Sequence, residues 1–147
     1  MVNQKLAKQI TEMAEIDQDL RLKAKPGKEL INYMIYVVDN IHNYRIWKIV
    51  EKYGYPTQKL IGKKSMKDFW LLVQHQDYDL DLQEKCLKYC DFEPKEKAFL
   101  TDRIFLHKGE KQLYGTQFHK PPKGKWKIWP IKNKKDFKTR RKKAGLE

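Results

Sequence analysis

The chain has 147 residues, of which 40% are hydrophobic and 12% aromatic, a composition that excludes an intrinsically disordered protein and suits one folded domain. Its formal net charge of +13 is unevenly distributed, because residues 118–147 hold ten Lys and two Arg but only two acidic residues, Asp136 and Glu147. No segment approaches the roughly 18 apolar residues that span a bilayer, and residues 1–8 lack the apolar core of a secretory signal, so we expect a cytoplasmic protein with no membrane partner.

Helices are predicted through the first half of the chain. Apolar residues recur at helical spacing over residues 4–23, and this amphipathic stretch ends before Pro26-Gly27. A second helix is predicted over residues 28–52, where a similar apolar row is stopped by Gly54 and Pro56. The stretch Ser65-Met66-Lys67-Asp68 resembles a capping box and predicts the start of a third helix, which is apolar on all sides and therefore buried.

The second half of the chain is also predicted to be helical at first, and the spacing of its apolar residues then changes. Residues 80–90 and 95–107 carry two helical patterns divided at Pro94, a residue well suited to a helix start. Beyond residue 110, Gly115, Gly124 and several prolines separate the apolar residues, which favours a small two-stranded element, and residues 136–143 are predicted as a short last helix. The predicted fold class is mainly α: a single-domain helical bundle over residues 1–147 with a small two-stranded β element near the C-terminus. We expect the basic segment 118–147 to pack on this bundle or to extend from it.

The two cysteines are predicted to be reduced. Cys86 and Cys90 are four residues apart on a predicted helix, a spacing that rarely meets disulfide geometry. A zinc site on them lacks two further thiol or imidazole ligands nearby in the sequence. A packing role is therefore favoured over a metal site.

Charged residues on apolar helix faces are the most informative feature of the sequence. At about 100° per residue, four carboxylates fall at such positions: Asp17, Asp39, Asp77 and Asp102. Arg45 likewise falls on the apolar side of the second helix. An isolated buried charge costs several kcal/mol, so four such carboxylates are expected to converge on a shared polar interior.

Two interpretations of that interior remain open. In the first it is a structural network, in which Asp17 pairs with Arg21, and Asp102 with Arg103 or Arg45. In the second it is an active site, with His75 as general base or metal ligand, Asp77 and Asp102 orienting it or binding a cation, and Arg103 neutralising an anionic group. A divalent cation such as magnesium or manganese suits the carboxylates, although the sequence has no recognised metal-ligand spacing.

The turn around Gly115 is unusually polar. Gln112, Tyr114, Thr116 and Gln117 surround the glycine, although a plain turn needs only the glycine itself. We therefore favour a turn that faces the helical pocket, where Tyr114 and Gln117 donate hydrogen bonds to a ligand or to the buried carboxylates. The alternative is a hairpin whose alternating residues only pack.

Familiar enzyme signatures are missing. The chain has no P-loop, no dinucleotide-binding glycine fingerprint, no Gly-x-Ser-x-Gly elbow and no His-Glu-x-x-His helix. Several common enzyme classes are therefore unlikely to include this protein.

Several short segments stand out in order along the chain: Met13–Gln18 with Arg21, Asp39 with Asn43, Tyr53–Pro56, Gly62, Gln74–Asp77 with Gln83, Asp102-Arg103, Gln112–Gln117 and Arg140-Arg141. As an ordered set they resemble a bacterial family known only as domain of unknown function 6624. The set covers nearly the whole chain, and each segment alone is weak. Two positions depart from the usual family pattern, with Tyr55 in place of Trp and Gln76 in place of Ala. The resemblance implies no established activity.

Three functions from different classes are compatible with these features. The first is a small hydrolase, group-transfer enzyme or binder of a small or anionic ligand, with His75, Asp77 and Asp102 as catalytic residues. Its predicted ligand-binding residues are Asp17, Arg21, Asp39, Arg103, Gln112, Tyr114, Thr116 and Gln117. The second is a nucleic-acid-binding module that uses the basic, aromatic C-terminal segment through Lys125, Trp126, Lys127, Trp129, Arg140 and Arg141. The third is a noncatalytic immunity or adaptor protein. The sequence leaves the substrate, the metal and the oligomeric state open.

Overall fold

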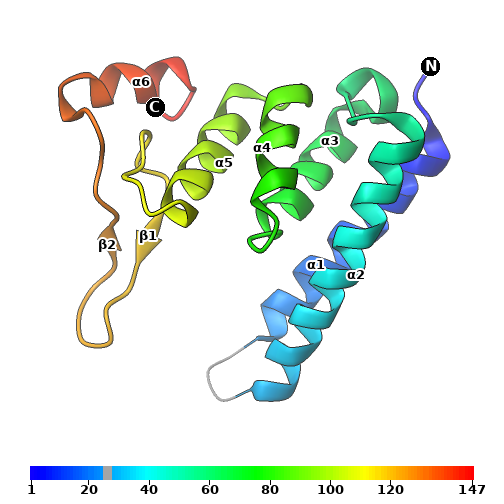
Figure 1. Cartoon of the computed structure of the whole chain (residues 1–147), viewed down its shortest axis with the longest axis horizontal. Coiled ribbons are helices and arrows are strands. Elements are labelled where there is room, and N and C mark those ends of the chain that lie inside the picture. The colour runs from blue at the N-terminus through cyan, green and yellow to red at the C-terminus, as the bar shows by residue number, and fades with distance from the viewer. Residues whose placement is uncertain (25–27) are drawn as a thin grey trace.

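The fold is given by a computed structural model, which describes residues 1–24 and 28–147. The helices are α1 (Gln4–Lys23), α2 (Glu29–Tyr53), α3 (Gln58–Gln74), α4 (Leu80–Tyr89), α5 (Pro94–His107) and α6 (Phe137–Lys143) (Figure 1). Two short strands, β1 (Phe118–His119) and β2 (Lys127–Ile128), and a 3-10 turn, η1 (Lys134–Asp136), lie between α5 and α6. The predicted fold class, mainly helical with a two-stranded element near the C-terminus, is confirmed.

Helices α1 and α2 run antiparallel as the longest pair in the molecule (Figure 1). The side chain of Asn3 accepts a hydrogen bond from Leu6 N at 3.0 Å and so caps the start of α1. Leu6, Ile10 and Met13 then point into the same buried cluster as residues of α2, α3, α4 and α5. The periodicity of residues 4–23 therefore predicted the bounds of α1 and most of its buried face, except that Ile16, an apolar residue of the same row, is 50% exposed.

Helix α3 begins earlier than the sequence suggested. Thr57 caps it by accepting a hydrogen bond from Leu60 N, and the helix is kinked at Gly62, whose φ of 82° favours glycine. The capping box predicted at Ser65 is therefore wrong. Ser65 is buried inside the helix, and its hydroxyl donates to the carbonyl of Ala7 at 3.4 Å, which holds α3 against α1.

Asp79 connects the start of α4 with α2. Its carboxylate accepts from Leu82 N at 3.0 Å as the cap of α4, and from Asn43 and from the indole of Trp47 at 2.9 and 2.8 Å. Pro94 stands in the first turn of α5, as predicted. None of the helices in the described residues is long and apolar enough to cross a membrane.

Cys86 and Cys90 are free and buried, as the sequence predicted. Burial and the hydrogen bond with Cys90 raise the pKa of the Cys86 thiol well above its ordinary value, the hydrogen bond contributing most. Both thiols therefore act as core residues.

The C-terminal part packs on the outer side of α5 (Figure 1). The two strands pair antiparallel, with Phe118 opposite Ile128 and His119 opposite Lys127. Gly115 has φ 67°, and a Cβ built on it would lie 2.8 Å from the Phe137 ring, so α6 closes directly over the turn. Position 115 therefore requires glycine both for its backbone conformation and for space.

Candidate functional site

His75, at the end of α3, is held by a buried carboxylate of α1. Its Nδ1 lies 2.8 Å from Oδ2 of Asp17, a residue of α1 that is only 1% exposed. Arg21 donates to the same carboxylate at 2.6 Å, which confirms the predicted Asp17–Arg21 pair. The other donors of Arg21 reach Asp39 of α2 at 2.9 and 3.2 Å. The cluster of Asp17, Arg21, Asp39 and His75 thus ties together α1, α2 and the end of α3.

The surroundings of Asp17 favour its charged form. Burial alone would raise the pKa of this carboxyl, but the hydrogen bond and charge of His75, helped by Gln18 and Arg21, outweigh the burial. The pKa of Asp17 therefore lies below its ordinary value of 3.8. An ionised Asp17 accepts from Nδ1–H of His75, and the Nε2 of the ring has no hydrogen-bond partner among the described residues.

A second histidine belongs to this cluster and was missed by the sequence analysis. His42 of α2 is 3% exposed, and its Nδ1 has no hydrogen-bond partner among the described residues. Burial lowers the pKa of His42, and the nearby charges of Asp17 and Asp39 oppose this only in part. Its position three residues after Asp39, on the same helix face, was the signal that could have revealed it.

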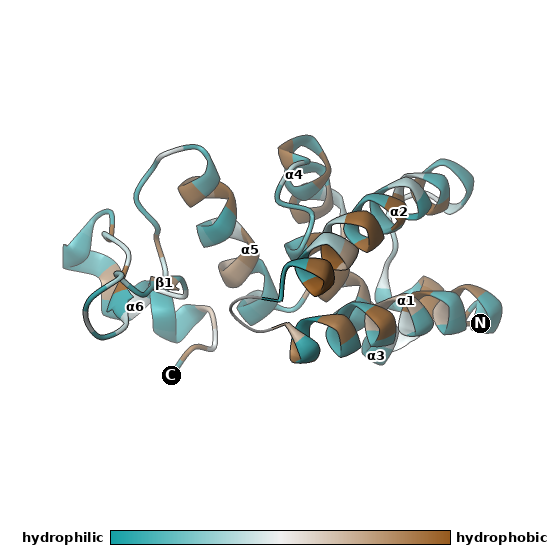
Figure 2. Cartoon of the chain, turned by 90° about the horizontal axis from the view of Figure 1, so that it is seen from below, coloured by the Kyte–Doolittle hydropathy of each residue, from teal (hydrophilic) through white to brown (hydrophobic). Residues whose placement is uncertain are grey.

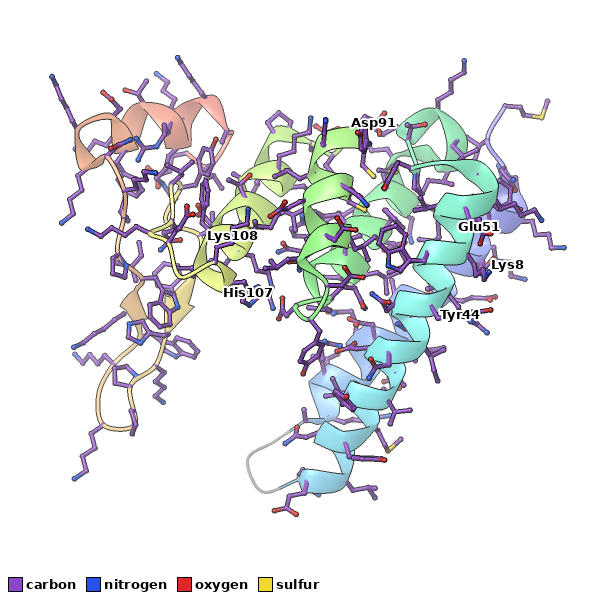
Figure 3. All side chains as sticks on the ribbon, in the orientation of Figure 1. Lys8, Tyr44, Glu51, Asp91, His107 and Lys108 are labelled. Atoms are coloured by element: carbon purple, nitrogen blue, oxygen red, sulfur yellow. The ribbon has the colours of Figure 1, made fainter. Side chains whose placement is uncertain are left out.

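Asp77, which follows α3 in the chain, orients the side chain of Arg103 on α5. The carboxylate accepts from Nε and Nη2 of Arg103, both at 2.7 Å, in a two-pronged pair. Burial would raise the pKa of Asp77, but the hydrogen bond and charge of Arg103 outweigh it and keep the pKa below 3.8. His107, one helical turn after Arg103, brings its Nδ1 within 3.7 Å of the same carboxylate and projects from the end of α5 (Figure 3).

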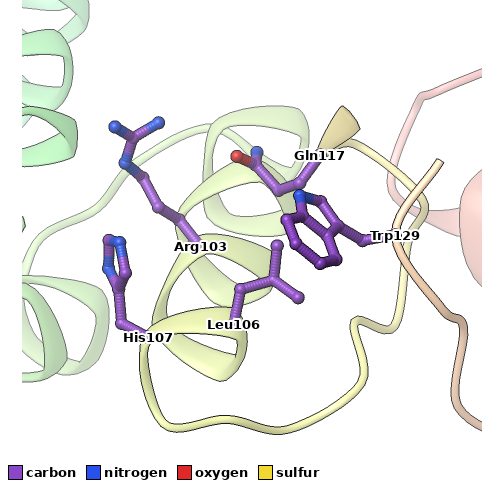
Figure 4. A pocket seen from close by; sticks show the side chains of 5 residues that line it. All are labelled: Arg103, Leu106, His107, Gln117 and Trp129. Atoms are coloured by element: carbon purple, nitrogen blue, oxygen red, sulfur yellow. The ribbon is translucent and has the colours of Figure 1, made fainter. Parts of the chain in front are cut away.

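A pocket opens beside this ion pair. Arg103, Leu106 and His107 of α5 form one wall, and Gln117 and Trp129 of the C-terminal part form the other (Figure 4). Its volume is about 280 Å³. The Trp129 indole is backed by the imidazole of His119, with ring centres 4.1 Å apart. The pocket therefore combines a guanidinium, an imidazole and a carboxamide with two apolar surfaces.

Asp102 has a different partner from the one predicted. It is fully buried, and its carboxylate accepts from the backbone N–H of Leu113, Tyr114 and Thr116 and from the Thr116 hydroxyl, at 2.7–3.0 Å. These four donors all come from the turn, so no hydrogen bond joins Asp102 to His75, Arg103 or Arg45 in the described residues. Arg45 itself is exposed. The predicted pairing of Asp102 with an arginine is wrong, and the carboxylate instead anchors the turn to α5.

Most polar residues of the turn hold the turn itself together. The Gln112 side chain is fully buried, donates to the carbonyls of Gln117 and Trp129, and accepts from Gln117 N. The Gln117 amide donates to the Thr116 hydroxyl and lines the pocket described above. Tyr114 lines a separate depression with Pro94 and Arg140. The turn does bind a buried carboxylate, Asp102, but through backbone N–H groups and Thr116, and the Gln117 amide, which was expected to donate to a ligand or a carboxylate, donates to Thr116 instead. Gln117 is the residue that the turn contributes to the pocket.

The basic residues of the C-terminal segment divide into two groups. Arg140 donates to the carbonyls of Leu113, Lys132 and Asn133, and Arg141 to those of Tyr114 and Gly115. Both guanidinium groups thus dock α6 on the turn. Lys125 and Trp126, on the connection between β1 and β2, and Lys127, at the start of β2, are exposed. A nucleic-acid interface would rest on this second group and on the other exposed lysines of the segment, not on the two arginines.

The four singled-out carboxylates are buried or half-buried, but they do not form one cluster. Asp17 and Asp39 share Arg21, Asp77 pairs with Arg103, and Asp102 binds the turn. Across residues 1–24 and 28–147, no group of three or more His, Cys, Asp or Glu side chains could hold a metal ion. The expected convergence is therefore seen only for Asp17 and Asp39, whereas Asp77 and Asp102 have separate partners.

Comparison with known families gives one match. The model of a family described as a family of unknown function, DUF6624, matches residues 2–147. Neither the curated proteins nor the solved structures contain a match to this chain.

Proposed function

Because this chain belongs to the DUF6624 family, whose function is unknown, its activity must be inferred from its own residues, and we propose that it binds a small anionic ligand with a planar apolar part. The ligand occupies the pocket of Arg103, Leu106, His107, Gln117 and Trp129. The observation that carries the proposal is the oriented guanidinium of Arg103 on the wall of this pocket.

The Asp77–Arg103 pair prepares Arg103 for an anion. Asp77 takes Nε and one hydrogen of Nη2, so the Nη1 edge has no partner among the described residues. A guanidinium held in one orientation loses less entropy when it binds a carboxylate or phosphate. His107 stands one turn further along the same helix and adds a ring nitrogen on the same side.

The remaining walls suit the apolar part of the ligand. Leu106 forms an apolar surface on α5, and the Trp129 indole, fixed by His119, offers a flat face opposite it. The Gln117 carboxamide supplies one donor and one acceptor. A phenyl-sized ring with one anionic group fits both the chemistry of these walls and the volume of about 280 Å³.

A titration followed by NMR tests this proposal. Phenyl phosphate, inorganic phosphate and phenol are added in turn, and the indole N–H signals of the four tryptophans are recorded. We expect phenyl phosphate to shift the Trp129 signal and to leave those of Trp47 and Trp70 unchanged, with phenol far weaker. Equal shifts for phenol, or no shift at Trp129 with any probe, would overturn the proposal.

A second candidate function is acid–base catalysis by His75. The contact of 2.8 Å between its Nδ1 and Asp17 favours it, since a buried carboxylate that fixes the ring is the arrangement used by general bases. Long-range nitrogen–proton NMR of the histidines tests it. The candidate requires neutral His75 to carry its proton on Nδ1, and a proton on Nε2 would exclude it.

The nucleic-acid and adaptor alternatives have weaker support. Lys125, Trp126 and Lys127 are exposed, which nucleic-acid binding requires. Arg140 and Arg141 donate to backbone carbonyls, so fewer of the predicted basic residues could contact nucleic acid than the sequence suggested.

A further inference from the structure

The outer face of α2 carries a second apolar stripe. Leu30, Met34, Val37, Ile41 and Tyr44 are between 36% and 72% exposed, and Figures 2 and 3 show α2 on the outside of the molecule. Their spacing alternates between four and three residues, which is the heptad spacing of a coiled-coil seam. Single exposed apolar residues are ordinary, but five on one seam form a continuous surface.

The inner face of the same helix is already occupied. Asp39, His42, Ile46 and Ile49 are buried there against the rest of the bundle. A surface helix normally has one apolar stripe and a polar opposite face. Helix α2 has a buried inner face and, in addition, an apolar outer face, which within the described residues is left exposed to solvent.

The charges around this stripe indicate which kind of molecule binds to it. Residues 29–44 contain neither Lys nor Arg, although the chain has 32 of them, and the only charged residues there are Glu29 and the buried Asp39. A surface that attracts acidic proteins, nucleic acid or anionic lipid would carry basic residues around its apolar centre. Two copies of a chain with net charge +13 repel each other, so a contact surface without Lys or Arg favours their association.

We propose that this stripe pairs α2 with α2 of a second copy of the chain in an antiparallel coiled coil. A seam of this kind satisfies two-fold symmetry when Val37 packs on Ile41 of the second copy and Met34 on its Tyr44. The symmetry axis then passes between Val37 and Ile41. The paired hairpins of α1 and α2 form a four-helix arrangement.

The residue that follows Tyr44 in the seam indicates whether the two copies of α2 pair parallel or antiparallel. The next residue at heptad spacing is Lys48, which is exposed and pairs with Glu51. A parallel pairing would place Lys48 of one copy against Lys48 of the other. The antiparallel pairing moves each Lys48 to the opposite end, near Glu29 of the second copy, where like charges no longer meet.

Analytical ultracentrifugation of the full chain tests the association. We expect a dimer whose dissociation constant rises at least about a hundredfold in Val37→Glu, because a carboxylate would be buried without a partner. The matched control is Trp126→Glu, which changes an apolar residue that is 67% exposed at the other end of the molecule. A wild-type monomer at all concentrations, or a dimer weakened equally by both substitutions, would overturn the proposal.

Cross-linking tests the direction. Asn40 is exposed, lies beside the seam and falls almost on the proposed symmetry axis. Oxidation of Asn40→Cys is expected to give a disulfide-linked dimer, whereas Asn32→Cys, an exposed position on the side of α2 opposite the seam, is expected to stay unlinked. Circular dichroism of both variants checks that they are folded. A dimer that links through residue 32 and not through residue 40 contradicts the antiparallel arrangement.

Discussion

The imidazole of His75 contacts the buried carboxylate of Asp17 at 2.8 Å, although the two residues are 58 positions apart in the chain. The contact joins the end of α3 to the middle of α1, and Arg21 extends it to Asp39 on α2. One network therefore fixes the relative positions of three helices. It also leaves one histidine nitrogen available next to a carboxylate whose pKa is depressed.

Replacing Asp17 with Asn should lower the free energy of unfolding at pH 7 by about 2–4 kcal/mol, because Arg21 and His75 lose a buried charged acceptor. Because the pKa of Asp17 is lower in the folded than in the unfolded state, its stabilising contribution is complete above pH 3.8 and disappears as the pH falls through the folded value. Urea unfolding from pH 7 to pH 2 should therefore show a shallower acid dependence in the variant. Asp19→Asn, which removes an exposed pair with Lys23 on the same helix, is the control and should change stability little.

His42 should make the protein sensitive to mild acid. Burial lowers its pKa below the ordinary value of 6.5, so the unfolded chain takes up a proton before the folded protein does. The unfolding free energy should fall below pH 6.5 by up to about 1 kcal/mol per pH unit from this group. His42→Leu removes this dependence, whereas His119→Gln, at a half-buried histidine near the other end, should keep it. Identical pH slopes for His42→Leu and the wild type would contradict the inference.

Asp102→Ala should loosen the turn around Gly115. Three backbone N–H groups and one hydroxyl lose their acceptor, which costs about 3 kcal/mol or more when they stay buried. Hydrogen exchange should accelerate at the amides of Leu113, Tyr114 and Thr116, with less change in α1. Thr101→Ala, the preceding residue, removes only an exposed hydroxyl contact within the helix and should leave these amides protected.

The two thiols should be unreactive in the folded protein. Cys86 and Cys90 are buried, and the raised pKa of Cys86 leaves little thiolate at neutral pH. A coloured thiol reagent should label neither within minutes under native conditions and both at once in urea. Rapid labelling of the folded chain would show that α4 opens easily.

Local patterns predicted the helices but not their partners. The bounds of α1 and α2 follow from apolar spacing and from Gly54 and Pro56, and the start of α5 follows from Pro94. The start of α3 was missed because Ser65–Asp68 resembles a capping box, whereas the helix begins at Gln58 and continues through a kink at Gly62. A kink of this kind depends on tertiary packing, which one sequence does not encode in a visible pattern.

Burial of the carboxylates was predictable from helix phase, and their pairing was not. Asp17, Asp39 and Asp102 lie at positions that periodicity marks as internal, and all three are buried. Which donor reaches each one depends on how the helices pack. Asp102 was expected beside an arginine and instead binds the turn, because four donors there satisfy all of its acceptor sites at short range.

Calorimetric titration of phenyl phosphate into two variants tests the central claim, that Arg103 receives an anion in the pocket it shares with Trp129. Arg103→Gln should weaken binding about 10- to 100-fold, the loss of a charged hydrogen bond. Asp77→Asn leaves the guanidinium in the pocket but no longer fixes its orientation, and should weaken binding less than Arg103→Gln does. Equal affinity in Arg103→Gln and the wild type, or loss of binding in Asp77→Asn alone, would contradict the account.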